Sequence, residues 1–374
     1  MKYVSQFQNA ATGYTQAALQ YLMALHSAGF LDFDIRPLGS SLSHTIAWRQ
    51  MPEWCDPLRT RREMTGETED VGIIHHTPDV VTLWQTHLSK RNVALTVTET
   101  SLIPTWLARK LNGLAAIIVP SQWNKDAFIQ SGVTVPVHVV PHALGDYWWK
   151  GYEPSDPTSK DDYVFGYAGT WNQRKNPEGL LRAYLRAFPK VGRARLALKL
   201  TASAGLRHYI EAVVESETGS ASRIQEGGDI WIYDEFWDEA KMRWFHRTLD
   251  CYVSAHRGEG WGYGLHHAAA LGKPVIHTGW SAPVEFLNPD YHPVLPYKMV
   301  QVEGMNLPPY MQDPLGRLEW ADPDMDALAE TLHSVESARP HVGPVEGMHA
   351  IRQLFGWQVI GERLATVVRS LQEG

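Results

Sequence analysis

The chain has 374 residues, of which 44% are hydrophobic and 20% charged, a balance that suits two globular α/β domains and excludes a disordered or fibrous protein. Its net charge of −7 comes from residues 151–374, because residues 1–150 hold 12 basic and 12 acidic side chains, and neither part shows the basic stripe of a nucleic-acid-binding protein. Because the sequence has no long apolar run, no signal-peptide pattern and no metal-binding spacing of its two cysteines, we expect a cytoplasmic protein without a membrane span, disulfide framework or cysteine-bound zinc.

Short β-branched runs alternate with helix-period segments along residues 1–150. This alternation predicts a parallel sheet with helices on both faces. The predicted strands are Lys2–Phe7, Asp32–Pro37, Gly72–His76, Ala94–Thr98, Ala115–Val119 and Val137–Val140, and the predicted helices are Tyr14–Ala28, Pro104–Leu111 and Gln122–Ser131.

A second alternating series begins at Tyr163, after a polar, Pro- and Ser-rich stretch at 151–162 that we interpret as a linker. We therefore expect an N-terminal domain over 1–150, a C-terminal domain over 163–345, and a final helix, roughly Met348–Leu371, within 346–374. The predicted strands of the second series are Val164–Ala168, Arg195–Thr201, Ile230–Tyr233, Cys251–Ala255 and Pro274–His277, with helices at Pro177–Phe188, Leu206–Glu217, Glu239–Leu249 and from about Gly264.

The most informative segment is the glycine-rich stretch 256–265, which follows a predicted strand and opens a helix of small residues. Its glycines would let backbone N–H groups approach a ligand, and a helix N-terminus favours a phosphate. Glu259 is the only carboxylate in the stretch and can accept hydrogen bonds from sugar hydroxyls. A tight strand-to-helix turn would need the same glycines, so this pattern alone is a weak signal.

A second loop, at 170–176, follows the first strand of the second series and carries Arg174 and Lys175. Two adjacent cations in such a loop can bind an anion. An exposed basic loop is the alternative interpretation. The Glu259 stretch in the same predicted domain favours the functional one.

Together these loops resemble GT-B-fold retaining glycosyltransferases of the family 4-like group. The segment from Glu259 resembles EGFGLPxxEAMAxGxPVI, with Glu259 at the first glutamate and His267 at the second. The segment from Phe165 resembles the VGR-x4-KG stretch, with Thr170 at the arginine and Lys175 at the lysine. The resemblance implies an α/β GT-B architecture of two Rossmann-like, doubly wound domains facing a central cleft, with the acceptor on the N-terminal domain and the donor on the C-terminal one.

The resemblance extends over most of the chain. The stretch 98–142 is similar to the family's ET-x-x-x-P-x-W … VPS … PHG segment, 281–285 to its G-x-x-E loop and 319–324 to its WAEPD segment. The matching positions in the first of these are Glu99, Pro104, Trp106, Asn112, Pro120, Ser121, Trp123, Phe128, Gly132, Val133, Pro136 and His142.

The resemblance also implies a role for each matched residue. Arg174 and Lys175 would hold the diphosphate, Glu259 the sugar hydroxyls, and one of His75 and His76 would approach the donor sugar. His267 would contact the ribose, so that donor affinity would change between about pH 5.5 and 8. The implied catalytic residues are Glu259, Lys175, Arg174 and His76; the donor site adds Gly13, Gly169, Thr170, Gly260, Trp261, Gly262, Tyr263, Gly264, Leu265 and His267; the acceptor-side candidates are His75, Glu99 and Trp106.

Three patterns imitate metal sites. Asp32–Asp34 and Asp322–Asp324 are Asp-x-Asp stretches, which are too short to be specific. The adjacent His266 and His267 cannot converge on one ion from a helix. We interpret all three as structural, and expect no metal and no cofactor besides a nucleotide-diphosphate sugar as co-substrate.

The function implied is transfer of a hexosyl or pentosyl group from a nucleotide sugar to a hydroxyl, with retention of configuration. A surface or exopolysaccharide glycan is the commonest acceptor of similar enzymes. A hydroxymethylated base in DNA, as for bacteriophage-type enzymes, is the alternative, for which Arg59, Arg61 and Arg62 would form a rim. A nucleotide-sugar epimerase on the same fold is a third hypothesis. The sequence does not indicate an oligomeric state.

Overall fold

The computed structural model describes residues 1–5, 13–37, 55–59, 69–84, 89–152, 161–201, 203–304, 306–339 and 345–373. The chain divides into two compact units. Unit 1 comprises Met1–Tyr147, Gln301–Trp320 and Arg352–Gly374, and unit 2 comprises Trp148–Val300 and Ala321–Ile351.

Unit 1 contains a six-stranded parallel sheet in the order β2-β1-β3-β4-β5-β6. Its central strands are apolar and buried, as expected of a sheet covered on both faces. The strand order reverses between β1 and β3, where a doubly wound sheet binds its ligands. The strands are β1 (Lys2–Ser5), β2 (Asp34–Pro37), β3 (Glu69–His75), β4 (Ser89–Leu95), β5 (Ala116–Val119) and β6 (Val137–Val139).

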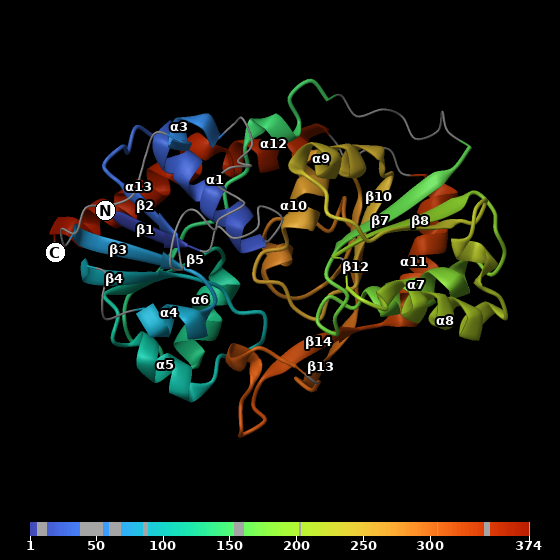
Figure 1. The fold of residues 1–374 in the computed structure, drawn as a ribbon, viewed down its shortest axis with the longest axis horizontal. Coiled ribbons are helices and arrows are strands. Elements are labelled where there is room, and N and C mark those ends of the chain that lie inside the picture. Colours follow the sequence, from blue (N-terminus) through green and yellow to red (C-terminus); the bar gives the residue numbers. More distant parts are fainter. Residues whose placement is uncertain are drawn as a thin grey trace. The chain divides into compact units, whose positions relative to one another are not determined.

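Helices cover both faces of this sheet, with α1 (Gly13–Ser27) and α13 (Trp357–Glu373) on one face and α4 (Pro78–Trp84) and α5 (Thr105–Leu111) on the other (Figure 1). The C-terminal helix α13 packs closely on α1, because a Cβ at Gly361 would lie 1.9 Å from the Ala24 carbonyl oxygen. The Trp357 Nε1 also donates a 2.6 Å hydrogen bond to Gln20 Oε1. The remaining helices of this unit are α3 (Asp56–Arg59), α6 (Gln122–Gln130), η7 (Pro309–Met311) and most of η3 (Asp146–Trp148).

Unit 2 contains a second six-stranded parallel sheet, in the order β12-β11-β10-β7-β8-β9. Renumbered within the unit, this is the Rossmann order 3-2-1-4-5-6, and its reversal falls between β7 and β10. The strands are β7 (Tyr163–Gly169), β8 (Ala194–Leu200), β9 (Ile230–Tyr233), β10 (Cys251–Ser254), β11 (Val275–Thr278) and β12 (Val294–Leu295).

Two layers of helices enclose the sheet of unit 2 (Figure 1). One layer holds α9 (Glu239–Thr248) and α10 (Tyr263–Ala270), and the other holds α7, α8 and α11. Side-chain caps define several helix starts: Asp238 accepts from the Lys241 amide, and Asp324 accepts from the amides of Asp326 and Ala327. The other elements are α7 (Pro177–Ala187), α8 (Leu206–Thr218), η5 (Ala221–Ile224), η6 (Ala282–Glu285) and α11 (Met325–Ala338).

The prediction of one final helix is wrong. Two helices, α12 (Val345–Leu354) and α13, replace it, because the helical conformation is interrupted at Phe355 and Gly356. The Leu144 amide donates a 2.8 Å hydrogen bond to the Phe355 carbonyl, and Leu144 forms a parallel bridge with Gly356. The backbone at the break is thus paired with another segment of unit 1.

Residues 301–320 also differ from their expected place, since they lie in unit 1 rather than with the second series. The reason is packing: Tyr310 and Met311 join the buried core of unit 1, and the Tyr310 hydroxyl donates to Glu99 Oε2 at 2.7 Å. The chain enters and leaves this excursion through two paired strands, β13 (Tyr297–Gln301) and β14 (Glu319–Pro323).

No helix in the described ranges is both long and apolar enough to cross a membrane. Most of the predicted linker lies outside the described residues, as do Arg61, Arg62 and the side chain of Arg59. The two cysteines, Cys55 and Cys251, are buried thiols.

Candidate functional site

The candidate site lies in unit 2, at the carboxyl ends of the neighbouring strands β7 and β10. The loop after β7 carries Arg174 and Lys175, and the loop after β10 carries Glu259. In a doubly wound sheet this crevice, where the strand order reverses, is where ligands bind. Two loops that are 84 residues apart in sequence therefore form one site.

A buried carboxylate with two cations forms the centre of this site. Lys175 Nζ donates to Glu259 Oε1, and Arg174 Nη1 lies 3.4 Å from Glu259 Oε2. The Glu259 side chain is 5% exposed, whereas those of Arg174 and Lys175 are 14% and 24% exposed. The cluster carries one net positive charge, and the cations are its more accessible part.

The ionisation of Glu259 follows from this arrangement. Burial raises the pKa of the carboxyl, but the charges of Lys175 and Arg174 outweigh burial and lower the pKa to about 2. Glu259 is therefore a carboxylate at neutral pH and can accept hydrogen bonds only.

The backbone of Glu259 is held by the loop after β11. Its amide donates to Ser281 Oγ at 3.0 Å, and its carbonyl accepts from the Ala282 amide at 3.3 Å. Ser281 is buried and has φ +67° and ψ −167°, a conformation that glycine adopts readily and serine does not. Sequence reasoning matched 281–285 to a family loop but gave Ser281 no role. The Ser281 hydroxyl and the Ala282 amide hold the backbone of Glu259 in place.

A tight turn presents the two cations. Asn172 Oδ1 accepts from the Lys175 amide at 2.9 Å, and the Asn172 carbonyl accepts from the Asn176 amide at 3.0 Å. Asn176 has φ +51° and caps α7 through its side chain. Arg174 Nη1 also donates to the Gly258 carbonyl at 2.6 Å, which ties this turn to the loop of Glu259.

Two glycines at the start of α10 are required for different reasons, one for its backbone conformation and one for close packing. Gly262 has φ +96° and precedes the helix without a side-chain cap. A Cβ at Gly264 would lie 2.1 Å from the Tyr252 hydroxyl, which donates to the Ala168 carbonyl at 3.1 Å. Gly264 therefore serves the packing of α10 on β10 and β7, as the strand-to-helix turn alone would require.

Several predicted donor-site residues contribute packing through their side chains. Trp261 and Leu265 are buried, and Trp261 Nε1 donates to His266 Nδ1 at 3.1 Å. Tyr263 packs on His267, and burial raises the pKa of its hydroxyl. The other predicted positions lie beside the ion cluster in sequence: Gly260 follows Glu259, and Gly169 and Thr170 end β7 and begin the cation loop.

His267 has a different environment from the one expected. Its ring stacks on Trp148 with centroids 3.5 Å apart and meets His246 edge to face. Burial lowers the pKa of His267 well below 6.5, and His246 and His266 lower it further. A lowered pKa disfavours protonation of this imidazole and so argues against the expected change in donor affinity between about pH 5.5 and 8, which stays a prediction.

The remaining candidates belong to unit 1. His75 ends β3 and is buried, with Nδ1 2.6 Å from the Tyr3 hydroxyl, and burial lowers its pKa well below 6.5. His76 is partly exposed, stacks on Tyr14 with centroids 5.3 Å apart, and its Nδ1 accepts from the Thr77 amide. Of the adjacent pair, His76 is thus the one with an accessible ring.

Three further candidates also lie in unit 1. Gly13 is the first residue of α1, and a Cβ there would lie more than 4 Å from the other described residues, its chain neighbour and the backbone of α1 aside. Glu99 accepts from Tyr310, and the 37%-exposed ring of Trp106 lies beneath Lys110 Nζ. Among the described candidates, Glu259, Lys175 and Arg174 are the ones that the structure joins by ion pairs.

The Asp-x-Asp stretch at 322–324 has structural contacts. Asp322 accepts from Arg257 Nε at 2.8 Å, and Asp324 caps α11. Across the described part of the chain, no group of three or more His, Cys, Asp or Glu side chains is arranged to hold a metal ion.

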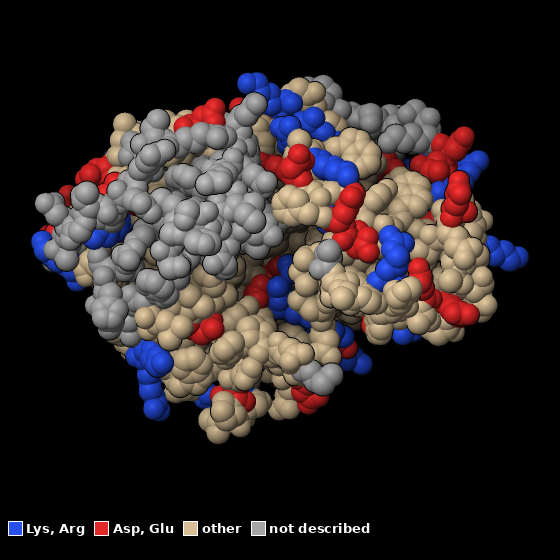
Figure 2. Space-filling model, viewed as in Figure 1, with Lys and Arg blue, Asp and Glu red and all other residues tan. Residues whose placement is uncertain are grey.

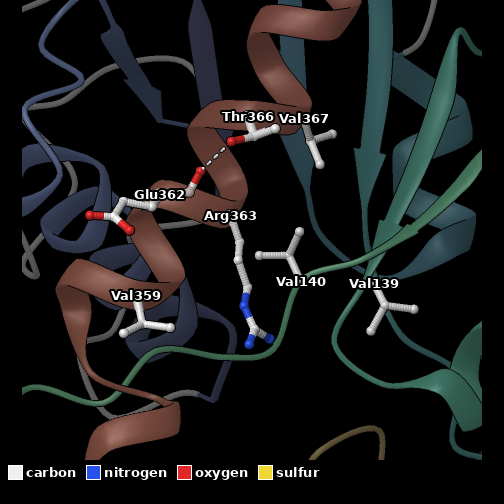
Figure 3. Close-up of a pocket in the computed structure, with 7 residues that line it drawn as sticks. All are labelled: Val139, Val140, Val359, Glu362, Arg363, Thr366 and Val367. Carbon is white, nitrogen blue, oxygen red and sulfur yellow. Dashed lines mark hydrogen bonds between the residues drawn. The ribbon is translucent and has the colours of Figure 1, made fainter.

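A shallow depression of about 380 Å³ lies in unit 1 between β6 and α13 (Figure 3). Its lining is aliphatic apart from three side chains of α13: Glu362, Arg363 and Thr366. Because β6 is an edge strand, this depression is not at the strand-order reversal of its sheet. We therefore place the candidate site at the Glu259 cluster.

No protein-family model matches the sequence, and no curated protein matches it. Solved structures match over the whole length. HepE of Anabaena, in complex with UDP and glucose, has a TM-score of 0.65 at 13% identity, covering 99% of this chain and 100% of that one. Sucrose-phosphate synthase of Thermosynechococcus elongatus has a TM-score of 0.67 at 14% identity, covering 99% and 98%. A trehalose-6-phosphate synthase of E. coli, bound with UDP-2-fluoro glucose, has a TM-score of 0.64 at 13% identity, covering 100% and 99%.

These structures are GT-B glycosyltransferases. At such low identities the similarity establishes the fold. Two doubly wound parallel sheets and full-length matches together confirm the predicted architecture: the chain has the GT-B fold.

Proposed function

We propose that the protein is a glycosyltransferase that uses a nucleotide-diphosphate sugar as donor. The observation that carries the proposal is the buried Lys175–Glu259–Arg174 cluster at the strand-order reversal of unit 2. Such a cluster offers cations to a diphosphate and a carboxylate to sugar hydroxyls at adjacent points. HepE has been solved with UDP and with UDP-glucose, which supports UDP-sugars as the first donors to test.

In the proposed reaction, Lys175 and Arg174 stabilise the diphosphate as it leaves. The bond between the anomeric carbon and the phosphate oxygen breaks, and the acceptor hydroxyl oxygen bonds to the same face of that carbon. The acceptor proton passes to the leaving phosphate oxygen. Glu259 holds sugar hydroxyls, and the first N–H groups of α10 offer further donors to the diphosphate or the sugar. His76 stays a candidate for contacting the donor sugar.

We propose a glycan rather than DNA as the acceptor. DNA-binding surfaces need clustered cations, whereas residues 1–150 are electrically neutral overall. Over unit 2 in Figure 2, basic side chains alternate with acidic ones on the visible face.

A thermal-shift screen of nucleoside diphosphates and their sugars tests the donor. A ligand present at 100 times its Kd stabilises the native state by about 2.7 kcal/mol, so the midpoint should rise by several degrees. Lys175→Ala should reduce this rise, whereas Lys90→Ala, which removes a lysine from an exposed ion pair with Asp70, should not. A wild-type protein that no nucleotide stabilises would contradict the proposal.

Product analysis separates the alternatives. Transfer of label from donor to a glycan supports the proposed acceptor. Salt-sensitive binding to duplex DNA would instead favour the modified-base acceptor. Conversion of the donor sugar without any acceptor would identify an epimerase.

A further inference from the structure

Arg257 lies two residues before Glu259 and contacts two other segments of unit 2. Its guanidinium donates from Nη1 to the Gln173 carbonyl at 2.6 Å and from Nε to Asp322 Oδ1 at 2.8 Å. Its own amide donates to the Arg174 carbonyl at 2.7 Å, and its carbonyl accepts from the Ala321 amide at 2.9 Å. One residue thus joins the cation loop, the Glu259 loop and β14.

These contacts restrain the cation loop at the point where it presents its charges. The carbonyls of Gln173 and Arg174 are consecutive, and both accept from Arg257. Hydrogen bonds to two consecutive carbonyls restrict the backbone of Arg174, which lies between them. Arg174 directly precedes Lys175. The guanidinium fork is itself oriented by Asp322, with which both Nε and Nη2 interact.

We propose that Arg257 is a positioning residue: held by Asp322, it sets the cation loop so that Lys175 meets Glu259 and, in the proposed function on which this inference rests, the donor diphosphate. Arg257 acts through Lys175 rather than by itself binding the diphosphate. The Arg257–Asp322 pair also gives a use to the Asp-x-Asp stretch other than metal binding.

The first experiment needs no ligand. Lys175 is partly exposed, and its ammonium group is paired with Glu259. Its rate of acetylation by trace acetic anhydride therefore reports how often the Lys175–Glu259 contact opens. In Arg257→Met, we expect the acetylation of Lys175, measured by mass spectrometry relative to Lys90, to rise several-fold. Asp322→Asn should give a smaller rise. Arg186→Met, which breaks an exposed ion pair with Asp326, should give none.

An unchanged ratio of Lys175 to Lys90 acetylation in Arg257→Met would overturn the proposal. So would a general rise at all lysines, because it would mean that Arg257 maintains the fold of the unit rather than this loop.

The second experiment uses inorganic pyrophosphate as a probe of the diphosphate site. Arg257→Met should weaken its binding on the order of 10-fold. Arg257→Met combined with Lys175→Met should bind no more weakly than Lys175→Met alone, because Arg257 acts through Lys175. Additive losses would show that Arg257 binds the anion independently and would overturn the proposal.

The two experiments separate the two hypotheses. A wild-type protein that binds neither pyrophosphate nor any nucleotide would contradict the proposed function. The acetylation ratio would still decide whether Arg257 positions Lys175.

Discussion

The two units place different chemistry at equivalent points of similar sheets. In unit 1 the strand order reverses between β1 and β3, and there His75 is buried with Tyr3, Tyr21 and His142 around it. In unit 2 the order reverses between β7 and β10, and there Glu259 is buried with Lys175 and Arg174. One site is neutral and aromatic, whereas the other is ionic.

Both buried groups have a lowered pKa, for opposite reasons. Burial lowers the pKa of His75 because it disfavours the charged imidazolium, and the neighbouring histidines add to this effect. Burial alone would raise the pKa of Glu259, but Lys175 and Arg174 reverse its effect. In both sites burial disfavours the charged form of the group. Whether the group is ionised nevertheless depends on the charges of the side chains that contact it.

The largest expected effect concerns the acid stability of the ionic site. The pKa of Glu259 lies at about 2 instead of 4.5, so its ionisation stabilises the native state above pH 4.5, and this stability is lost as the pH falls toward 2. The contribution is on the order of 3 kcal/mol. Glu259→Gln should therefore be less stable than wild type at pH 6, and the difference should shrink by pH 3, as measured by urea unfolding.

Asp70→Asn is the matched control, because Asp70 pairs with Lys90 at an exposed position where ion pairs contribute little. A constant difference between Glu259→Gln and wild type from pH 6 to 3 would mean that the carboxyl is not kept ionised by its partners.

The next effect concerns turnover. Removing one fixed cation from a developing phosphate charge costs on the order of 10²-fold in kcat, so Lys175→Ala should lose at least this much once a donor and acceptor are known. The loss should appear in kcat with the protein still folded, since Arg174 continues to neutralise Glu259. Unchanged turnover in folded Lys175→Ala would remove Lys175 from the proposed site.

A smaller effect tests the neutral site of unit 1. A lowered histidine pKa stabilises the native state above pH 6.5, and this stability falls as the pH drops, by up to about 1.4 kcal/mol per pH unit. The double variant Tyr3→Phe/His75→Phe removes both hydrogen-bonding partners and keeps aromatic rings. Its unfolding free energy should fall less steeply than that of wild type between pH 6.5 and 5. Parallel curves would show that His75 does not contribute to acid sensitivity.

The smallest expected effect is no change at all. We expect EDTA to leave turnover intact, because Lys175 and Arg174 would meet the diphosphate charge, while Asp322 pairs with Arg257 and Asp324 caps α11. If EDTA abolished turnover and Mg²⁺ or Mn²⁺ restored it, the assignment of these aspartates to structural contacts would have to be revised.

Much of the fold follows from local sequence pattern. Short β-branched runs alternating with amphipathic segments determine two parallel sheets, and the predicted strands lie close to those observed, with Ile230–Tyr233 unchanged. Ala94–Thr98 is the exception: the strand runs from Ser89 to Leu95, since pairing with β3 extends over polar residues that carry no apolar signal. Lys175 and Glu259 could also be selected as candidate site residues from the sequence, because each lies in a loop of distinctive composition that follows a predicted strand.

Only the tertiary structure decided which of these loops meet. Lys175 contacts Glu259 because β7 pairs with β10. Arg257 likewise contacts Asp322 on β14, 65 residues further along the chain. The same holds for the stack of His267 on Trp148, which moves the pKa of that imidazole away from its expected range. Sequence pattern records the local period of polar and apolar residues, whereas burial and charge partners come from segments far apart in the chain, and these decide which groups are ionised and what they can bind.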